Sequence, residues 1–285
     1  MPNATQRART TRIVQSRHNS RVKELRSAFL HPGRGERGLI AIEGELLLSE
    51  VLRSGLLPAA IFLRSGGEDA LDRLAAQPDV QRALDAAEIL ELPADVFSSA
   101  VDTESPQGIA ALLAPPQFDF EDLFPPHTPA LLLIAAGLQD PGNLGTLIRS
   151  AEAFGATGVI TLPGTVNTWN AKTVRASAGS VFRMPVITRC AEEVVARLQT
   201  LGVMLFATTA DGHLPATEAV LVKPSALLIG NEGAGLSTDL LAAADAQLAI
   251  PCPGPVESLN AAIAGSILLY EASRQRALPL KASRS

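Results

Sequence analysis

The chain has few cysteines, few histidines and no long hydrophobic run, and each shortage excludes a class of protein. Cys190 and Cys252 are the only cysteines among 285 residues, so no disulfide framework or zinc spacing is present. The longest apolar runs have the length of strands, which predicts no membrane span. The arginine-rich start has no apolar segment behind it, so we do not expect it to be a secretory signal. A reducing, cytoplasmic setting fits these features. No metal is expected, because the four histidines are scattered: His18, His31, His127 and His213.

Charge is unevenly distributed along the chain. The net charge is −5, yet residues 1–38 hold nine Lys and Arg against two Glu, a local charge of +7 that leaves −12 for the rest. A basic arm on an acidic body is typical of proteins that contact nucleic-acid phosphates, although such arms also occur as solvated tails. We expect the phosphate-contacting side chains of this segment to include Arg17, Arg21, Lys23 and Arg34.

The first part of the chain alternates between helical and strand patterns. Residues 19–29 predict a capped amphipathic helix, with Val22, Leu25, Ala28 and Phe29 on one face. Strands at 39–42, 60–63, 87–92 and 109–113 alternate with helices at 44–53, 68–76 and 94–100. This alternation predicts a small α/β domain over 13–113, preceded by a flexible basic tail, 1–12. Residues 114–129 contain five prolines and predict a semi-rigid linker without regular structure.

The second half predicts a larger α/β domain over 130–276, followed by a tail, 277–285. The apolar run 130–136 predicts a buried strand, which Gly137 and the cluster 140–142 break. Asn143 is expected to cap the helix that follows, Gly155 to end it, and residues 158–161 to form the next strand. Polar residues thus gather at the carboxyl end of a strand, where open α/β sheets bind ligands. Further strands are expected at 185–188, 203–207, 227–230 and 247–250, with helices at 191–201 and 258–274.

Three motifs occur in order in this half. Asn143, Gly145 and Arg149 form N-x-G-x-x-x-R, residues 230–236 read GNEGAGL, and residues 258–260 read SLN. Together they resemble the signature motifs of the SpoU (TrmH) family of RNA 2′-O-ribose methyltransferases. The resemblance is close over 130–276 and looser over the N-terminal half. It is carried there by Ser16, Asn19 and residues 40–48, which resemble the family's substrate-binding domain.

The resemblance implies a fold and a chemistry. It implies a C-terminal parallel sheet of the SPOUT type with a deep trefoil knot, a homodimer through this domain, and S-adenosylmethionine as the methyl donor. The implied catalytic residues are Arg149, Asn143, Glu232, Ser258 and Asn260. The implied cofactor residues are Thr208, Gly230, Gly233, Gly235, Ile250 and Leu259. Lys172, Arg175 and Ser180 are expected to border the RNA site.

Several roles stay open at this stage. Arg149 is either the general base of the family or, as we prefer, a clamp for a substrate phosphate, because a guanidinium remains charged in proteins. Glu232 could cap its own turn, and Ser258 with Asn260 could cap the last helix. Lys172 and Arg175 could belong to a solvated helix face. Cys252 could act as a nucleophile on a pyrimidine, but a small residue at a strand end fits it better.

The functional alternatives differ in class. By analogy with the family, the separate N-terminal domain favours a structured ribosomal RNA over transfer RNA as the substrate. A non-catalytic RNA-binding protein of the same fold is a second reading, which the presence of all five catalytic positions disfavours. A dinucleotide-dependent oxidoreductase fails, because the spacing G-x-x-G-x-G at 230–235 is the reverse of the dinucleotide fingerprint.

Overall fold

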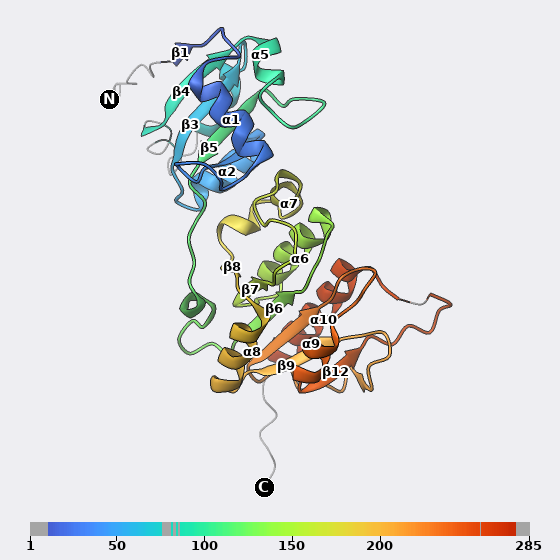
Figure 1. Ribbon diagram of the computed structural model, residues 1–285. Helices are drawn as coiled ribbons and strands as arrows, with labels where there is room; N and C mark the ends of the chain where they lie inside the picture. The colour runs from blue at the N-terminus through green and yellow to red at the C-terminus, as the bar shows by residue number, and fades with distance from the viewer. Residues whose placement is uncertain (1–10, 76–80, 82–83, 85, 257, 278–285) are drawn as a thin grey trace. The chain divides into compact units, whose positions relative to one another are not determined.

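The computed structural model describes residues 11–75, 81, 84, 86–256 and 258–277 (Figure 1). Within them the chain forms two compact units. One contains the described residues up to Pro116 together with Trp169–Arg175, and the other contains Gln117–Thr168 and the described residues from Ala176 onward. The predicted tails fall largely outside the description, since 1–10 and 278–285 are not covered.

The N-terminal unit is built on a five-stranded mixed sheet with the strand order β1-β4-β3-β5-β2. β4 is parallel to both of its neighbours, whereas β5 is antiparallel to β3 and β2. The elements of this unit are β1 (Thr11–Ile13), α1 (Ser20–Leu30), β2 (Ile40–Glu43), α2 (Glu45–Arg53), β3 (Pro58–Arg64), α3 (Glu68–Ala75), β4 (Glu88–Leu92), α5 (Ala94–Ser98) and β5 (Ile109–Leu113).

Helix α1 begins where the sequence predicts it. The Asn19 side chain accepts a hydrogen bond from the backbone N–H of Arg21 at 2.9 Å, which satisfies one of the free donors of the first turn. The predicted apolar face, Val22, Leu25, Ala28 and Phe29, is buried. It packs into a core that also contains residues of β3, β4 and α5. The expected α/β character of this unit is therefore confirmed.

The C-terminal unit is built on a seven-stranded sheet whose strands are all parallel. Its strand order is β10-β12-β9-β11-β6-β7-β8. The elements are η1 (Phe120–Leu123), β6 (Leu131–Ala135), α6 (Pro141–Ala153), β7 (Gly158–Thr161), η2 (Ser180–Phe182), β8 (Val186–Thr188), α8 (Ala191–Thr200), β9 (Met204–Thr208), β10 (Leu214–Pro215), β11 (Ser225–Ile229), α9 (Thr238–Ala243), β12 (Ala246–Ala249) and α10 (Ala261–Ala277). Helix α7 (Ala171–Ala176) follows β7 in the sequence, and all but its last residue belongs to the N-terminal unit.

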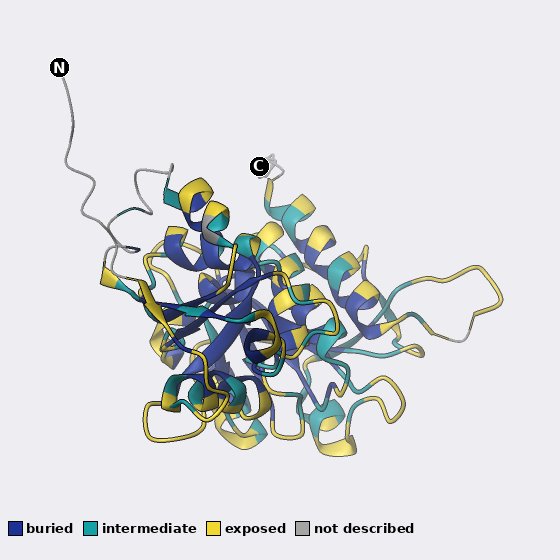
Figure 2. Cartoon of the chain, turned by 90° about the horizontal axis from the view of Figure 1, so that it is seen from above, coloured by how far each residue is buried: buried dark blue, intermediate teal, exposed yellow. Residues whose placement is uncertain are grey.

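The central strands of this sheet are covered on both faces. All residues of β6 and β11 are buried. Figure 2 shows buried residues in dark blue, and they make up most of the strands at the centre of the chain. Strands buried on both faces are uniformly apolar in sequence, which is why 130–136 and 227–230 are recognisable as continuous apolar runs. The parallel arrangement places the carboxyl ends of β6, β11, β9 and β12 along one edge of the sheet.

The start of α6 differs from the prediction. Asp140 caps the helix, because its side chain accepts a hydrogen bond from the backbone N–H of Asn143 at 2.9 Å. Pro141 occupies the first turn, where its missing N–H costs nothing. The expectation that Asn143 caps this helix is therefore wrong, and its side chain is left for contacts with other segments.

The predicted linker is also partly ordered. Phe120 and Leu123 lie on the short helix η1 and are buried in the core of the C-terminal unit, and Arg197 stacks over the Phe120 ring at 4.9 Å. The expectation of no regular structure in 114–129 is wrong for these residues, because aromatic and aliphatic burial outweighs the local effect of the prolines. Three short elements were not predicted: β1, β10 and α9.

Candidate active site

The candidate site lies where four loops leave the parallel sheet. β12, β9, β11 and β6 are neighbours in the sheet, and their following loops start at Ile250, Thr209, Gly230 and Ala136. In open α/β sheets the crevice outside these strand ends is the usual place for a ligand. Segments that are far apart in the sequence are thus gathered at one edge by the strand order.

The glycine-rich loop after β11 is a closed turn. The backbones of Asn231 and Gly235 exchange two hydrogen bonds of 3.0 Å, and the Asn231 Oδ1 accepts from the N–H groups of Gly233 and Ala234 at 2.9 Å. A Cβ atom at Gly230 would lie 2.6 Å from the carbonyl carbon of Gly235, so only glycine fits there. The Asn231 Nδ2 also donates to the Gly137 carbonyl at 2.7 Å, which ties this loop to the end of β6.

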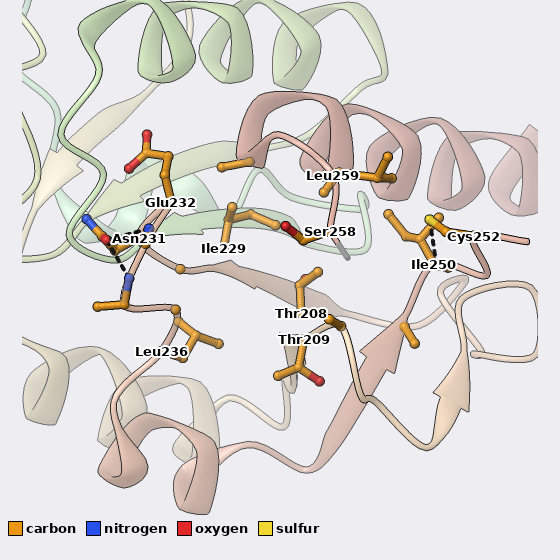
Figure 3. Close-up of a pocket in the computed structure, with 18 of the residues that line it drawn as sticks. Thr208, Thr209, Ile229, Asn231, Glu232, Leu236, Ile250, Cys252, Ser258 and Leu259 are labelled. Atoms are coloured by element: carbon orange, nitrogen blue, oxygen red, sulfur yellow. Dashed lines mark hydrogen bonds between the residues drawn. The ribbon is translucent and has the colours of Figure 1, made fainter. Parts of the chain in front are cut away.

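A cavity of about 540 Å³ opens between the loops that follow β9, β11 and β12 and the segment that enters α10 (Figure 3). Its volume is within the range of about 300–1,000 Å³ typical of small-molecule sites. All six residues predicted to bind a cofactor line it: Thr208, Gly230, Gly233, Gly235, Ile250 and Leu259.

Two hydroxyls in the cavity wall lack partners. The Oγ1 atoms of Thr208 and Thr209 are buried and have no hydrogen-bond partner among the described residues. Leaving a buried hydroxyl unpaired costs about 1–3 kcal/mol, so a ligand with polar edges would stabilise this wall. The glycine backbones, the unpaired hydroxyls and the apolar side chains of Ile229, Leu236 and Leu259 fit a nucleoside-sized ligand with both polar and apolar parts.

Three of the predicted catalytic residues form a hydrogen-bonded chain. Asn260 Nδ2 donates to Asn143 Oδ1 at 3.1 Å, and Asn143 Nδ2 donates to Glu232 Oε1 at 2.9 Å. The other Glu232 oxygen accepts from the backbone N–H of Gln139 at 3.4 Å. Each of the three motifs supplies one member, so segments centred on residues 143, 232 and 260 meet at the rim of the cavity.

The geometry resolves two of the capping alternatives. The Asn260 Oδ1 accepts from the N–H groups of Ala262 and Ile263 at 2.9 and 3.2 Å, so Asn260 caps α10 and also joins the chain of side chains. The expectation that the helix starts at Ser258 is wrong, since α10 begins at Ala261. Ser258 instead lines the cavity.

The surroundings of Glu232 at this rim favour its ionised form. Partial burial raises its pKa, but the hydrogen bonds from the Asn143 side chain and from the backbone N–H groups of Gln139 and Asp140 outweigh burial and lower the pKa below the ordinary value. Its partners lie largely in another segment, so the expectation that it only caps its own turn is incomplete.

Arg149 and Cys252 lie in different surroundings. Arg149 is exposed on α6, and its side chain has no hydrogen-bond or ion-pair partner among the described residues. Its guanidinium is therefore accessible to a substrate. Cys252 lines the cavity, and its thiol donates to the Ile250 carbonyl at 3.3 Å.

The predicted RNA-contacting residues fall into three groups. Arg17 pairs with Asp95 at 2.8 Å, and Arg21 pairs with Glu24 at 2.9 Å and with Glu88 at 2.7 Å. Exposed side chains are found at Lys23, Arg34, Lys172 and Arg175. Ser180 is 4% exposed, and its hydroxyl bonds to Glu152, so it stabilises the turn after α7.

Neither a metal site nor a membrane helix is found in the part of the chain that the structure covers. No group of three or more His, Cys, Asp or Glu side chains there could hold a metal ion. No described helix is both long and apolar enough to cross a bilayer.

Sequence reasoning missed two residues that hold the site together. Asn231 ties the glycine-rich loop to the end of β6, and Asp140 fixes the start of α6. Both stand beside predicted positions, but the sequence cannot show that an asparagine in a turn bonds to a carbonyl 94 residues away.

The chain is similar to known proteins over nearly its whole length. Residues 130–270 match the model of the SpoU rRNA Methylase family, and residues 19–111 match that of the MRM3-like substrate binding domain. The Bacillus subtilis 23S rRNA (guanosine(2553)-2'-O)-methyltransferase RlmP is 34% identical over 90% of this chain and 97% of its own length. The chain belongs to the SpoU family. The resemblance drawn from the three motifs is thereby confirmed.

Solved structures of RNA methyltransferases share the fold. An RNA 2′-O ribose methyltransferase is 32% identical with a TM-score of 0.76, covering 93% of this chain and all of its own. An rRNA methyltransferase from Sinorhizobium meliloti, solved with S-adenosylmethionine bound, is 30% identical with a TM-score of 0.78, covering 93% of this chain and 98% of its own. The α/β class with a parallel methyltransferase sheet and a separate N-terminal substrate-binding domain is confirmed.

Proposed function

We propose that this protein transfers a methyl group from S-adenosylmethionine to the 2′-hydroxyl of a ribose in RNA. The observation that carries the proposal is the meeting of Asn143, Glu232 and Asn260 at the rim of a cavity whose lining contains all six predicted cofactor residues. When bound, the donor supplies an electrophilic methyl on sulfur. The protein contributes mainly by holding donor and hydroxyl in line, which can supply most of the acceleration.

Arg149 is proposed to hold the RNA rather than to take the proton. A guanidinium stays charged at any pH at which the enzyme works, so it is a poor base, but its fork of donors matches a phosphate. Its exposure and lack of protein partners among the described residues leave these donors available. A positive charge beside the ribose also favours the developing alkoxide.

Ribosomal RNA is the proposed substrate class. The similarity to RlmP, whose name specifies 23S rRNA, and the match to a substrate-binding domain over residues 19–111 support it. Exposed Lys23 and Arg34 on that unit, and Lys172 and Arg175 on α7, are proposed phosphate contacts. Transfer RNA is the alternative that site mapping would distinguish.

The chain topology, the oligomeric state and the location in the cell are also proposals. We propose a trefoil knot in the C-terminal unit, which the family resemblance implies. The position of β11 between the earlier strands β9 and β6 is compatible with it. We also propose a homodimer through α10 and a cytoplasmic location, which the two free cysteines suit.

Methyl transfer from labelled donor to total RNA tests the proposed function. Wild-type protein is expected to label RNA at ribose 2′-oxygens, and Arg149→Ala should lower the rate by about 100-fold or more, as loss of a transition-state contact does. Lys223→Ala, which removes an exposed positive charge elsewhere in the same unit, should leave the rate unchanged.

The outcome for Arg149→Lys separates the roles of the guanidinium. A single ammonium cannot form two parallel hydrogen bonds to a phosphate, so turnover should fall clearly in this variant. Near-normal turnover at neutral pH would argue against the clamp. RNA binding without any methyl transfer by the wild type would favour the non-catalytic alternative.

A further inference from the structure

The described residues that line the cavity carry charge of one sign only. Among the described residues that line it, Glu232 is the only carboxylate, and no Lys, Arg or His is present. The remaining lining consists of apolar side chains, backbone groups, hydroxyls, one amide and one thiol. The fixed charge of this wall is therefore negative.

The position of that charge is defined by its neighbours. Asn143 Nδ2 at 2.9 Å and the Gln139 N–H at 3.4 Å hold one carboxylate oxygen each. In Figure 3 the carboxylate lies at the rim, on the side of α6, rather than at the centre of the cavity. From this position the Glu232 carboxylate can attract a positively charged ligand electrostatically without direct contact.

The proposed reaction changes the charge of whatever occupies the cavity. The ribose oxygen forms a bond to the methyl carbon as the S–C bond breaks, the hydroxyl proton passes to water, and the sulfur keeps the electron pair of the broken bond. The donor carries one more positive charge than the thioether product, S-adenosylhomocysteine. A negative wall distinguishes these two molecules, which otherwise differ by one methyl group.

We propose that Glu232 makes the cavity prefer the cationic donor over the neutral-sulfur product, so that methyl transfer itself weakens retention of the spent cofactor. This inference rests on the proposed function, in which the cavity holds S-adenosylmethionine. It gives Glu232 a role in ligand specificity in addition to its place beside Asn143 and Asn260.

Calorimetric titration of three ligands tests the inference without any turnover. The ligands are S-adenosylmethionine, S-adenosylhomocysteine and sinefungin, an analogue that carries an ammonium group where the donor has its sulfonium. In Glu232→Gln the dissociation constants of the two cationic ligands should rise about threefold to tenfold, and that of the product less than about twofold. Glu232→Asp, which keeps the charge, should retain the wild-type ranking.

Two controls make the titration specific. Glu192→Gln removes an exposed carboxylate on α8 that does not line the cavity, so all three dissociation constants should stay within about twofold. For the wild type, raising the salt from about 0.05 to 0.5 M should reduce the preference for the cationic ligands, since salt screens an interaction at an exposed rim.

The outcomes are distinguishable. Equal weakening of all three ligands in Glu232→Gln, or no change in any of them, overturns the charge preference while leaving the proposed function intact. Failure of folded wild-type protein to bind the donor at all overturns the proposed function, and the inference falls with it. Circular dichroism of each variant establishes that it is folded.

Discussion

Arg276, in the last turn of α10, donates hydrogen bonds to four backbone carbonyls. They belong to Pro129, Ala130, Leu221 and Lys223, at distances of 2.6–2.9 Å. Burial lowers the pKa of this guanidinium, and no carboxylate offsets that effect. One side chain thus links the end of the last helix to the segments that enter β6 and β11.

Replacing Arg276 should destabilise the fold. Arg276→Ala removes the donor to the Pro129 and Leu221 carbonyls, whereas the Ala130 and Lys223 carbonyls still accept hydrogen bonds from Ser225. We therefore expect a loss of about 1–3 kcal/mol in the free energy of unfolding, measured by urea denaturation. Arg276→Lys should recover little, because one ammonium cannot reach all four acceptors. Arg274→Ala, which removes an exposed partner of Glu271 at 2.8 Å on the same helix, should cost less than about 1 kcal/mol. Equal losses at the two positions would contradict this role.

Residue roles were predictable only where local chemistry dictates them. Gly230 could be assigned from the sequence, because a backbone that leaves a strand and approaches a ligand closely favours a residue without a Cβ atom. The role of Asn143 could not be assigned from the sequence, because an asparagine that follows this turn can either cap the helix or contact a distant segment. Arg276 looks like any cation that complements a helix dipole, and only the folded chain brings the four carbonyls to it.

At the scale of elements, the N-terminus of α10 determines which atoms donate and which accept in the hydrogen bonds that join Asn260, Asn143 and Glu232. The Asn260 Oδ1 is committed to two N–H groups of the first turn, so its Nδ2 must face Asn143. Asn143 then accepts on its oxygen and donates from its nitrogen to Glu232. The helix start therefore fixes the orientation of two amides.

Two substitutions at Asn260 separate its capping role from its role in the site. Asn260→Asp keeps an acceptor for the helix N–H groups but cannot donate to Asn143. Thermal stability should therefore be retained, while the rate of methyl transfer falls tenfold or more, which corresponds to an increase of about 1.4 kcal/mol or more in the activation free energy. Asn260→Ala loses both functions and should also cost about 1 kcal/mol of stability. Full activity of Asn260→Asp would show that only the cap matters.

Elements with a strong apolar pattern were predictable, and elements without one were not. α2 was found at Glu45–Arg53 and β5 at Ile109–Leu113, as expected. β1 was missed because all three of its residues are exposed, and β10 because it has only two residues. η1 was missed because the prolines on both sides of it suggest a linker, whereas burial of Phe120 and Leu123 decides the outcome.

At the scale of the C-terminal unit, strand order is the property that the sequence did not reveal. Alternating strands and helices predict a parallel sheet, but they do not show that β11 lies between β9 and β6. That insertion brings the glycine-rich loop beside the end of β6 and next to α6. Only the recognised motifs indicated that these segments converge, because local periodicity carries no information about neighbours in a sheet.

The outer face of α10 is apolar and exposed. Ile263, Ile267 and Tyr270 are 53%, 39% and 56% exposed, and their spacing of four and three residues places them on one side of the helix. The Tyr270 ring also contacts Phe154 edge-on, with centroids 5.7 Å apart. A contiguous apolar stripe of this kind is typical of a surface that another chain covers.

The proposed dimer predicts that charge on this stripe separates the subunits. Wild-type protein at micromolar concentration should sediment at about twice the chain mass of 29.8 kDa, because a two-fold interface pairs the same helix from both copies. Ile263→Glu combined with Ile267→Glu buries like charges in that interface and should shift the protein to monomer. Leu201→Glu, at an exposed leucine beyond the end of α8, is the matched control and should leave the dimer intact. A wild type that sediments as a monomer, or a control that dissociates as readily as the double variant, would contradict an interface on α10.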